Sequence, residues 1–399
     1  GHARATVDSP RVAQDRPHYD GVVSIDPAAR TLIASWRITF VAPSRGDSVT
    51  LLVNPGLRVS DVHGDGIGAA RVASDSEFTR ITLPITTTVA DTRTVALRLS
   101  GTPQFGTDRI NGIDTTWVEL GVDSFWFPVF AEFRQQVTAR VALHTPTRWP
   151  VAASGTVRWV RDAAYIDQRV PQVDIAFVAA PGLRRVEGTG VATYVVSTPD
   201  SITRTVLGVA SDCRSSLNAQ FGARSAVPPT SFVLAPRPGP GYARGDYIVL
   251  SAEASTSRAY LTGFICHELA HFWSRRADSD GPENWLNEGF AEYVSGREVR
   301  RAVGDDAYAS LANAWDARSR GQPPIWTPAA TRRPNAMVAY RKAPFLLHRL
   351  EARVGRTTMD NILRRYMVDG VRTTPELLRA IREVAGAETE RWFADELAR

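Results

Sequence analysis

The amino-acid sequence predicts a two-domain α+β protein in which an all-β domain precedes a mostly helical one. Apolar residues make up 43% of the 399 residues, which is enough for more than one hydrophobic core. Between residues 18 and 198, apolar and polar residues alternate between turn signals, which predicts successive strands. From residue 199 the pattern becomes mainly helical. We therefore expect an N-terminal extension at 1–17, a β domain at 18–198 and a helical domain at 199–399.

The β domain is predicted to open with a hairpin. The segment HYDGVVSIDPAARTLIASWRITFVAP contains a turn at Asp26-Pro27. After the turn, Trp36, Ile38 and Phe40 alternate with polar residues and should share one face of the sheet. Gly, Pro or Asp separate the further predicted strands, which are SVTLLVNP, LRVSDVHGDG, EFTRITLP, TVALRLSGT, FWFPVF, VTARVALHTP, VDIAFVAAP and VATYVVSTP.

The second domain begins with a predicted helix, SITRTVLGVASDCRSSLNAQFG, followed by the strands TSFVLAP and DYIVLSAEA on either side of a proline-rich loop. From Ser257 onward the pattern is mostly helical. One helix is expected to start at Thr374-Pro375-Glu376, with a capping threonine and a proline in the first turn.

The distribution of charge argues against a nucleic-acid partner. The net charge is +5, and Lys342 is the single lysine among 47 basic residues. A nucleic-acid-binding protein would gather its positive charge on one face. Here acidic residues interrupt the scattered arginine pairs at 184–185, 275–276, 300–301, 332–333 and 364–365. No apolar run approaches the roughly 18 residues of a membrane span. We therefore predict neither nucleic-acid binding nor a membrane span.

The two cysteines and the start of the chain bear on the compartment. Cys213 and Cys266 cannot form a disulfide framework, although one bridge between them is possible. Cys266 precedes His267 on a helix that we expect to be buried, so we interpret both cysteines as small buried side chains. No initiator methionine is present, which would fit removal of an export segment. We therefore expect a periplasmic or secreted protein.

The segment GFICHELAHFWSRR carries the most specific motif. If residues 257–274 form a helix, His267 and His271 lie one turn apart on the same face. Two histidines with this spacing can direct ring nitrogens at one zinc ion. Glu268 would lie beside them, where it can take a proton from water that the zinc activates. The alternative is a chance match to this HExxH pattern.

A third ligand is available on the next predicted helix. A catalytic zinc site needs three protein ligands and one open position. The segment NWLNEGFAEYVSG predicts a helix from about Asn284, and turn residues before it would bring it back antiparallel. Glu288 would then face His267 and His271. Glu292, one turn later, is placed to accept the second ring N–H of a histidine ligand; the alternative is an exposed helix carboxylate.

These motifs together resemble the zinc signature of the M1 aminopeptidases, a family of gluzincin metallopeptidases. The matching residues are His267-Glu268-Leu-Ala-His271 followed by Trp-Leu-Asn-Glu288-Gly-Phe-Ala. The resemblance implies a saddle-shaped or sandwich-like N-terminal β domain, a thermolysin-like catalytic domain and one Zn²⁺ per chain. It covers most of the sequence, weakly in the β part and strongly at 264–293.

The resemblance also implies a tyrosine that stabilises the oxyanion of the tetrahedral intermediate. In MVAYRKAPFLLHRLEARVG, Tyr340 matches that tyrosine. A neutral phenol that points at the developing negative charge can donate a hydrogen bond to it. The alternative is a core tyrosine on an amphipathic helix.

Three departures from the family pattern affect the predicted activity. The spacing between His271 and Glu288 is sixteen residues, shorter than is usual in the family. The family's Gly-Ala-Met-Glu-Asn motif, whose glutamate binds the substrate's α-amine, is missing. Alignment on the next strand places GYARGDYIVLS there, with Arg244 at the position of the glutamate. Replacing a carboxylate by a cation reverses the sign of the interaction with an ammonium group.

We accordingly treat Gly241, Tyr242 and Arg244 as candidate substrate-binding residues. Arg244 could recognise a substrate carboxylate or be a solvated loop arginine, and Glu253 could compensate for the missing glutamate. The segment DYIVLSAEA is expected to be the sheet edge that pairs with an extended substrate. The family's C-terminal helical domain is not expected after Arg399, which would leave the cleft more open.

The sequence therefore predicts a zinc metallopeptidase that lacks the usual amine anchor, acting as an endopeptidase or an unusual exopeptidase on peptides or proteins. One alternative is an ordinary aminopeptidase. The second alternative is a non-catalytic module that keeps zinc for structure and binds a peptide or protein partner. The oligomeric state and the side-chain preference stay open.

Overall fold

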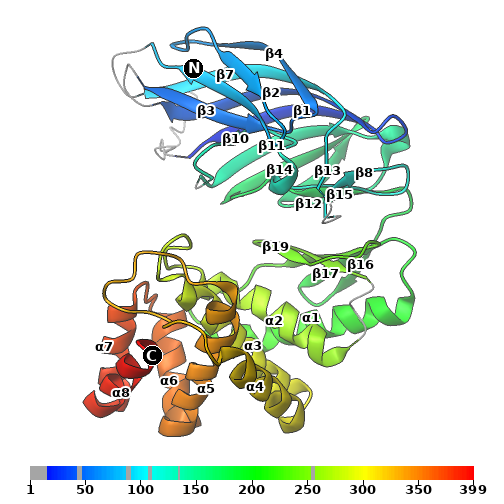
Figure 1. Cartoon of the computed structure of the whole chain (residues 1–399). Helices are drawn as coiled ribbons and strands as arrows, with labels where there is room; N and C mark the ends of the chain where they lie inside the picture. The colour runs from blue at the N-terminus through cyan, green and yellow to red at the C-terminus, as the bar shows by residue number, and fades with distance from the viewer. Residues whose placement is uncertain (1–15, 43–46, 87–90, 107–109, 134, 253–256) are drawn as a thin grey trace, which may run out of the picture. The chain divides into compact units, whose positions relative to one another are not determined.

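The computed structural model describes residues 16–42, 47–86, 91–106, 110–133, 135–252 and 257–399 (Figure 1). The chain divides into two compact units. The first contains residues up to Arg184 together with Tyr194–Ser197 and Val233–Ser251. The second contains Arg185–Thr193, Thr198–Phe232 and Ala252–Arg399. The first unit is built from strands and the second is mainly helical, so the predicted fold class is confirmed.

Three sheets form most of the first unit. The largest has seven strands in the order β13 (Thr156–Val160), β14 (Ala163–Gln172), β11 (Val137–His144), β1 (His18–Asp26), β2 (Thr31–Ala42), β7 (Asp91–Gly101), β4 (Leu57–Gly64). A second sheet has the order β10 (Val129–Phe130), β3 (Ser48–Val53), β6 (Thr79–Pro84), β5 (Arg71–Ser74). A third has the order β12 (Val151–Ala153), β15 (Phe177–Ala179), β9 (Val118–Leu120), β8 (Gly112–Ile113).

The predicted opening hairpin is formed by β1 and β2. Its turn follows Asp26, whose Oδ1 accepts hydrogen bonds from the N–H groups of Ala28 and Ala29. Trp36, Ile38 and Phe40 are all buried, as the alternation predicted. Burial of this apolar face supplies the main stabilisation of the sheet.

A five-stranded sheet has the order β16 (Arg184–Gly188), β17 (Val191–Val195), β18 (Thr230–Ala235), β20 (Tyr247–Ser251), β19 (Tyr242–Arg244). The prediction that the strand at 247–251 is a sheet edge is therefore wrong. Arg244 pairs with Tyr247, and only Gly245 and Asp246 lie between them. Gly245 has φ of +63°, which a glycine adopts without strain. This two-residue turn pairs β19 antiparallel with β20, so β19 is the edge strand of the sheet.

The helices of the second unit are α1 (Asp200–Phe221), α2 (Arg258–Ser274), α3 (Asn284–Ala302), α4 (Asp305–Ser319), α5 (Ala343–Val354), α6 (Arg356–Met367), α7 (Thr374–Ala385) and α8 (Ala387–Leu397). A π-helical turn, η3 (Val338–Lys342), leads directly into α5. The predicted capping threonine is shifted by one residue, because Thr373 is the N-cap of α7. Its side chain accepts the N–H of Glu376 in a capping box. None of the helices in the described ranges is long and apolar enough to cross a bilayer.

A disulfide links α1 to α2. Cys213 and Cys266 are bonded, with their Cα atoms 5.3 Å apart. Both cysteines are buried, as interpreted from the sequence, and the bridge that the sequence left possible is present. The two helices pack against each other and bring together residues 53 positions apart in the sequence, which local pattern does not reveal. The bridge ties α1 to the residue that precedes His267.

Candidate metal centre

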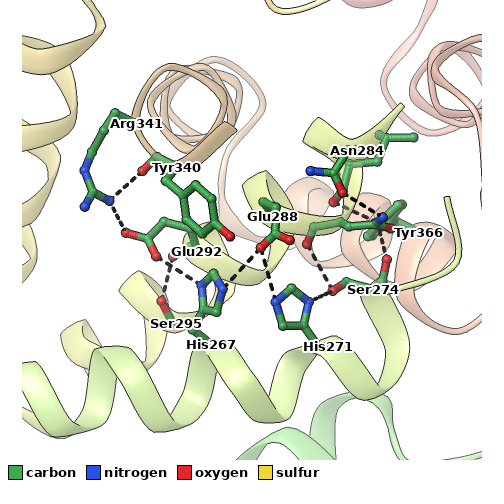
Figure 2. Close-up of polar contacts among 12 residues, drawn as sticks. His267, His271, Ser274, Asn284, Glu288, Glu292, Ser295, Tyr340, Arg341 and Tyr366 are labelled. Carbon is green, nitrogen blue, oxygen red and sulfur yellow. Dashed lines mark hydrogen bonds and ion pairs between the residues drawn. The ribbon is translucent and has the colours of Figure 1, made fainter. Parts of the chain in front are cut away.

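Helices α2 and α3 position the candidate ligands. Ser257 caps α2 by accepting the N–H of Tyr260. The connection to α3 is held by Asn287, whose side-chain Oδ1 accepts the N–H of Ala277 at 3.0 Å and whose Nδ2 donates to the Ala277 carbonyl at 3.1 Å. This two-point contact fixes the start of α3 against the end of α2, so Glu288 faces the histidines from the neighbouring helix (Figure 2).

His267, His271 and Glu288 converge on one point (Figure 2). Glu288 Oε2 lies 3.5 Å from His267 Nε2 and 3.2 Å from His271 Nε2. The three candidate ligand atoms all lie within 4.8 Å of one another, and all three residues are buried. The structure thus brings together the three residues that the sequence proposed as ligands.

The outer hydrogen bonds of the two rings determine which nitrogen faces the centre. His267 Nδ1 lies 3.1 Å from Glu292 Oε2, and a carboxylate oxygen can only accept. His271 Nδ1 lies 3.2 Å from the hydroxyl of Ser274. That hydroxyl donates its own proton to the Asn287 carbonyl at 3.1 Å, so it accepts from the ring. Both rings therefore carry a proton on Nδ1 and turn Nε2 towards the centre, where the neutral form of each ring presents its lone pair.

This arrangement fits a zinc ion. Three acceptors meet at the centre, and Glu288 Oε2 is buried without a hydrogen-bond partner among the described residues. Without a metal, the negative charges of Glu288 and Glu292 favour a protonated His267. Burial lowers the pKa of His267, but Glu288 and Glu292 outweigh burial and raise the pKa to about 10. Two imidazoles and one carboxylate with a further open position form a donor set typical of catalytic zinc.

Glu292 links His267 to two other groups. In addition to the ring N–H, its carboxylate accepts hydrogen bonds from Arg341 Nη1 at 2.9 Å and from Trp315 Nε1 at 3.3 Å. Burial opposes ionisation of Glu292, but the bond from His267 outweighs it and the pKa is lowered. The carboxylate therefore stays charged and fixes the ring orientation. Sequence reasoning found Glu292 but missed Trp315, Arg341 and Ser274, whose roles depend on contacts between helices.

Tyr340 lies on the π-helical turn η3, and its ring stacks on His267 with the ring centres 5.7 Å apart. Burial, together with the negative charge of Glu288, raises the pKa of the phenol, which therefore stays protonated at neutral pH. The residues that follow anchor the turn. Arg341 donates to Glu292 and to the Tyr340 carbonyl, while Lys342 Nζ donates to the Gln322 and Pro323 carbonyls at 3.0 and 2.9 Å. Single π turns are frequent at functional sites.

Glu268 is partly exposed and lines a cavity of about 580 Å³ together with His267 and Tyr340. Glu292 lines the same cavity, but its two oxygens accept hydrogen bonds from His267, Trp315 and Arg341, so Glu268 is the better placed of the two to meet a bound molecule beside the candidate ligand atoms. A group in that position can exchange protons with a bound molecule.

The three candidate substrate-binding residues belong to the first unit. Arg244 Nε donates to Asp174 Oδ2 at 2.6 Å, and NH2 donates to Asp123 Oδ2 at 3.3 Å. The guanidinium also lies over the ring of Tyr242, 4.8 Å from its centre, and Gly241 immediately precedes β19. Arg244 is thus engaged by two carboxylates and is not a solvated loop arginine. Glu253 lies outside the described residues.

No protein-family model matches the chain, and no curated protein matches it either. Solved structures do. The M1 zinc metallopeptidase from Deinococcus radiodurans gives a TM-score of 0.69 at 22% identity, over 96% of this chain and 93% of that one. A variant of a two-domain M1 zinc metallopeptidase bound to L-arginine gives 0.72 at 21% identity, over 96% and 94%. Leukotriene A4 hydrolase from Saccharomyces cerevisiae gives 0.65 at 16% identity, over 95% and 66%.

These similarities extend over both units and define the fold. The chain has the fold of the two-domain M1 zinc metallopeptidases, with a β-rich domain followed by a helical one. The resemblance seen in the sequence motifs is therefore confirmed at the level of the fold.

Proposed function

We propose that the protein is a zinc-dependent metallopeptidase that hydrolyses peptide bonds. The convergence of His267 Nε2, His271 Nε2 and Glu288 Oε2 supports this most directly, because two imidazoles and one carboxylate form a buried donor set suited to a zinc ion. When bound, zinc would polarise the substrate carbonyl and lower the pKa of water towards neutrality. The similarity in fold to M1 zinc metallopeptidases supports the same function.

The chain's own groups supply the proton transfers. Glu268 takes a proton from the attacking water and passes it to the leaving amine, since it is the accessible carboxylate beside the ligands. Tyr340 donates its phenolic proton in a hydrogen bond to the developing oxyanion, because its raised pKa keeps it protonated. Glu292 and Ser274 hold the two histidine rings in the orientation described above.

We propose further that it is an endopeptidase or an unusual exopeptidase. The similar two-domain enzyme binds free amino acids and a Tyr-Ser-Ala substrate, each of which has a free α-amine. In this chain the position of the family's amine-binding glutamate aligns with Arg244, which is bound to Asp174 and Asp123. An arginine held in this way supplies no carboxylate for an amine. The alternative is an ordinary aminopeptidase, which would bind the amine through other groups.

Cleavage of one peptide series distinguishes these activities. The zinc-loaded protein is incubated with a peptide that has a free N-terminus and with its N-acetylated form, and the cut sites are mapped by mass spectrometry. We expect internal cuts at similar rates in both forms. Cleavage confined to the first residue of the free peptide would establish the aminopeptidase alternative.

A non-catalytic zinc-containing module that binds a peptide or protein is the second alternative. It predicts that Glu268→Gln leaves zinc binding and peptide binding unchanged, because Glu268 would have no catalytic role. The peptidase proposal predicts that this variant binds a stoichiometric zinc ion but loses about 100-fold to 10,000-fold in turnover. Turnover equal to that of the wild type, at equal zinc content, would contradict the assigned role of Glu268.

We also propose that the protein is exported. The bond between Cys213 and Cys266 supports this, because disulfides persist mainly in oxidising compartments. Thiol titration under denaturing conditions would test the proposal with protein isolated from its native host. We expect no free thiols in that protein, whereas two free thiols per chain would count against export.

A further inference from the structure

A cavity of about 580 Å³ opens from the candidate metal centre into the helical unit. Its catalytic end is formed by His267, Glu268 and Tyr340. The walls come from α2, α3 and α4. They are mainly apolar and include Tyr260, Phe264, Val299, Leu311 and Trp315. This volume lies within the roughly 300–1,000 Å³ range of ligand pockets.

The serine and carboxylate groups along these walls are bonded within the protein, whereas Arg341 Nε is buried without a hydrogen-bond partner among the described residues. The hydroxyl of Ser295 donates to the Glu292 carbonyl at 2.8 Å, and that of Ser310 donates to the Asp306 carbonyl at 2.9 Å. The Glu292 carboxylate is bound by Arg341. The walls therefore offer a ligand mostly apolar contact, and polar recognition is confined to the catalytic end and to Arg318 on the exposed side.

Three helix glycines near the site differ in which neighbouring atoms an added Cβ would meet. A Cβ at Gly289 would lie 2.7 Å from Ala343 Cβ, and one at Gly296 would lie 2.6 Å from the Trp315 ring. Packing therefore requires both glycines. Gly263 lines the cavity on α2, and a Cβ there would meet only Val299 Cγ2, at an ordinary 3.8 Å. Packing within the protein therefore does not exclude a side chain at position 263. Glycine is nevertheless present there, although it destabilises a helix relative to alanine.

We propose that the space beside Gly263 is kept for the substrate, and that the cavity receives a large apolar side chain, aliphatic or aromatic, from a residue flanking the cleaved bond. This inference rests on the proposed peptidase function and specifies its substrate class. Gly263 sets the depth of the cavity, while Phe264 and Leu311 contact the bound side chain.

The first test measures kcat/KM for quenched fluorescent peptides in which one flanking position at a time is Leu, Phe, Ala, Asp or Lys. At one of the two positions we expect Leu and Phe to exceed Ala by about 10-fold to 200-fold, because each buried methylene contributes to discrimination. Asp and Lys should be poorer than Ala. Equal values for Leu, Phe and Ala at both positions would overturn the proposal.

The second test changes the cavity. Gly263→Leu should lower kcat/KM for the Leu and Phe peptides at least 10-fold and leave the Ala peptide within about 3-fold. Gly263→Ala should reduce the preference to a smaller extent while raising the melting temperature by about 2 °C, because alanine favours the helix. The matched control is Gly208→Ala on α1, where a Cβ would meet nothing within 4 Å. It should give the same gain in melting temperature with no change in preference.

A binding measurement separates this inference from the proposed function. Calorimetry with the zinc-loaded Glu268→Gln variant compares the affinities of the Phe-containing and Ala-containing peptides. Tighter binding of the Phe peptide, lost in the Glu268→Gln/Gly263→Leu double variant, supports the cavity even if the wild type cleaves nothing. Loss of activity on all peptides alike in Gly263→Leu, at unchanged zinc content and with equal binding of both peptides, would overturn it.

Discussion

Helix α3 carries residues of two buried polar clusters that differ in how their charges are balanced. In the metal cluster, Glu288 Oε2 lies 3.5 Å and 3.2 Å from the Nε2 atoms of His267 and His271, and only a proton on one of these rings can balance its charge from within the cluster. In the second cluster, Glu351 of α5 accepts hydrogen bonds from the hydroxyl of Tyr293 and from Arg300 Nη2, the latter at 2.8 Å, and Arg297 Nε lies 3.4 Å away. One carboxylate thus faces two titratable rings and the other has permanent cations in place.

The difference indicates which cluster is built for a ligand. A buried charge is stable when it is paired and hydrogen-bonded. The Glu351 carboxylate meets that condition with the protein's own groups, although Arg297 Nη1 is itself buried without a hydrogen-bond partner among the described residues. The metal cluster meets it when a cation binds or, without a metal, when His267 is protonated. We therefore expect changes at Glu288 to affect metal binding, and changes at Glu351 to affect folding stability.

The largest expected effect is on zinc affinity. Glu288→Gln should weaken zinc binding by about 4 kcal/mol, roughly a thousandfold, because it removes one ligand of the set. The stability of the metal-free protein should change by only about 1 kcal/mol, since His267 can lose its proton and leave a neutral cluster. Competition with a chromophoric chelator gives the affinity. Glu268→Gln is the matched control, because it removes a carboxylate beside the same histidine without removing a ligand.

The Glu351 cluster should respond in the opposite way. Glu351→Gln leaves Arg300 without its carboxylate partner and Arg297 with Asp360 alone, and should lower the free energy of unfolding by about 3 kcal/mol. Zinc affinity should change less than threefold. Urea unfolding of the metal-free protein measures the first quantity. The matched control is Glu388→Gln, whose exposed pair with Arg353 should contribute less than about 1 kcal/mol. Comparable destabilisation by Glu351→Gln and Glu388→Gln would show that the buried Glu351 cluster contributes no more to stability than an exposed ion pair.

Lowering the pH should reduce the difference in unfolding free energy between the wild type and Glu351→Gln. Burial opposes ionisation of Glu351, but the hydrogen bonds from Tyr293 and Arg300 outweigh it and lower its pKa in the folded state. The stability gained from this group is complete above its unfolded pKa of about 4.3 and is lost as the pH falls through the lower folded value. The difference in unfolding free energy between wild type and variant should therefore be constant near neutral pH and shrink below about pH 4. A constant difference down to pH 2 would exclude this explanation.

The smallest expected effect concerns Arg341, which acts on His267 through Glu292. Arg341→Gln should weaken zinc binding by about 10-fold, in the lower part of the range for groups that orient metal ligands. Arg341→Lys should recover part of that loss. Arg318→Gln is the control, because Arg318 is an exposed arginine on the same cavity. Equal zinc affinities for wild type and Arg341→Gln would show that Glu292 holds the ring without help.

The two clusters also show which contacts local pattern could predict. His267, His271, Glu288 and Glu292 lie together as expected, because each pair lies one turn apart on its own helix. The partners of Arg244 could not be predicted in this way, since Asp174 and Asp123 lie 70 and 121 positions away. The disulfide was left undecided and the edge strand was predicted wrongly for a related reason. Both depend on which segments pack or pair side by side, and no local periodicity encodes that choice.

The sequence by itself determined the order of strands and helices and the spacing of the candidate metal-binding side chains. These features are local, because they depend on periods of two and of three to four residues along the chain. Only the tertiary structure decided that Glu288 Oε2 lies between two imidazole Nε2 atoms, that Arg244 is bound by two aspartates and that Gly263 borders a cavity. Each of these depends on contacts between elements far apart in the sequence, where the geometry of packing sets distance and charge balance.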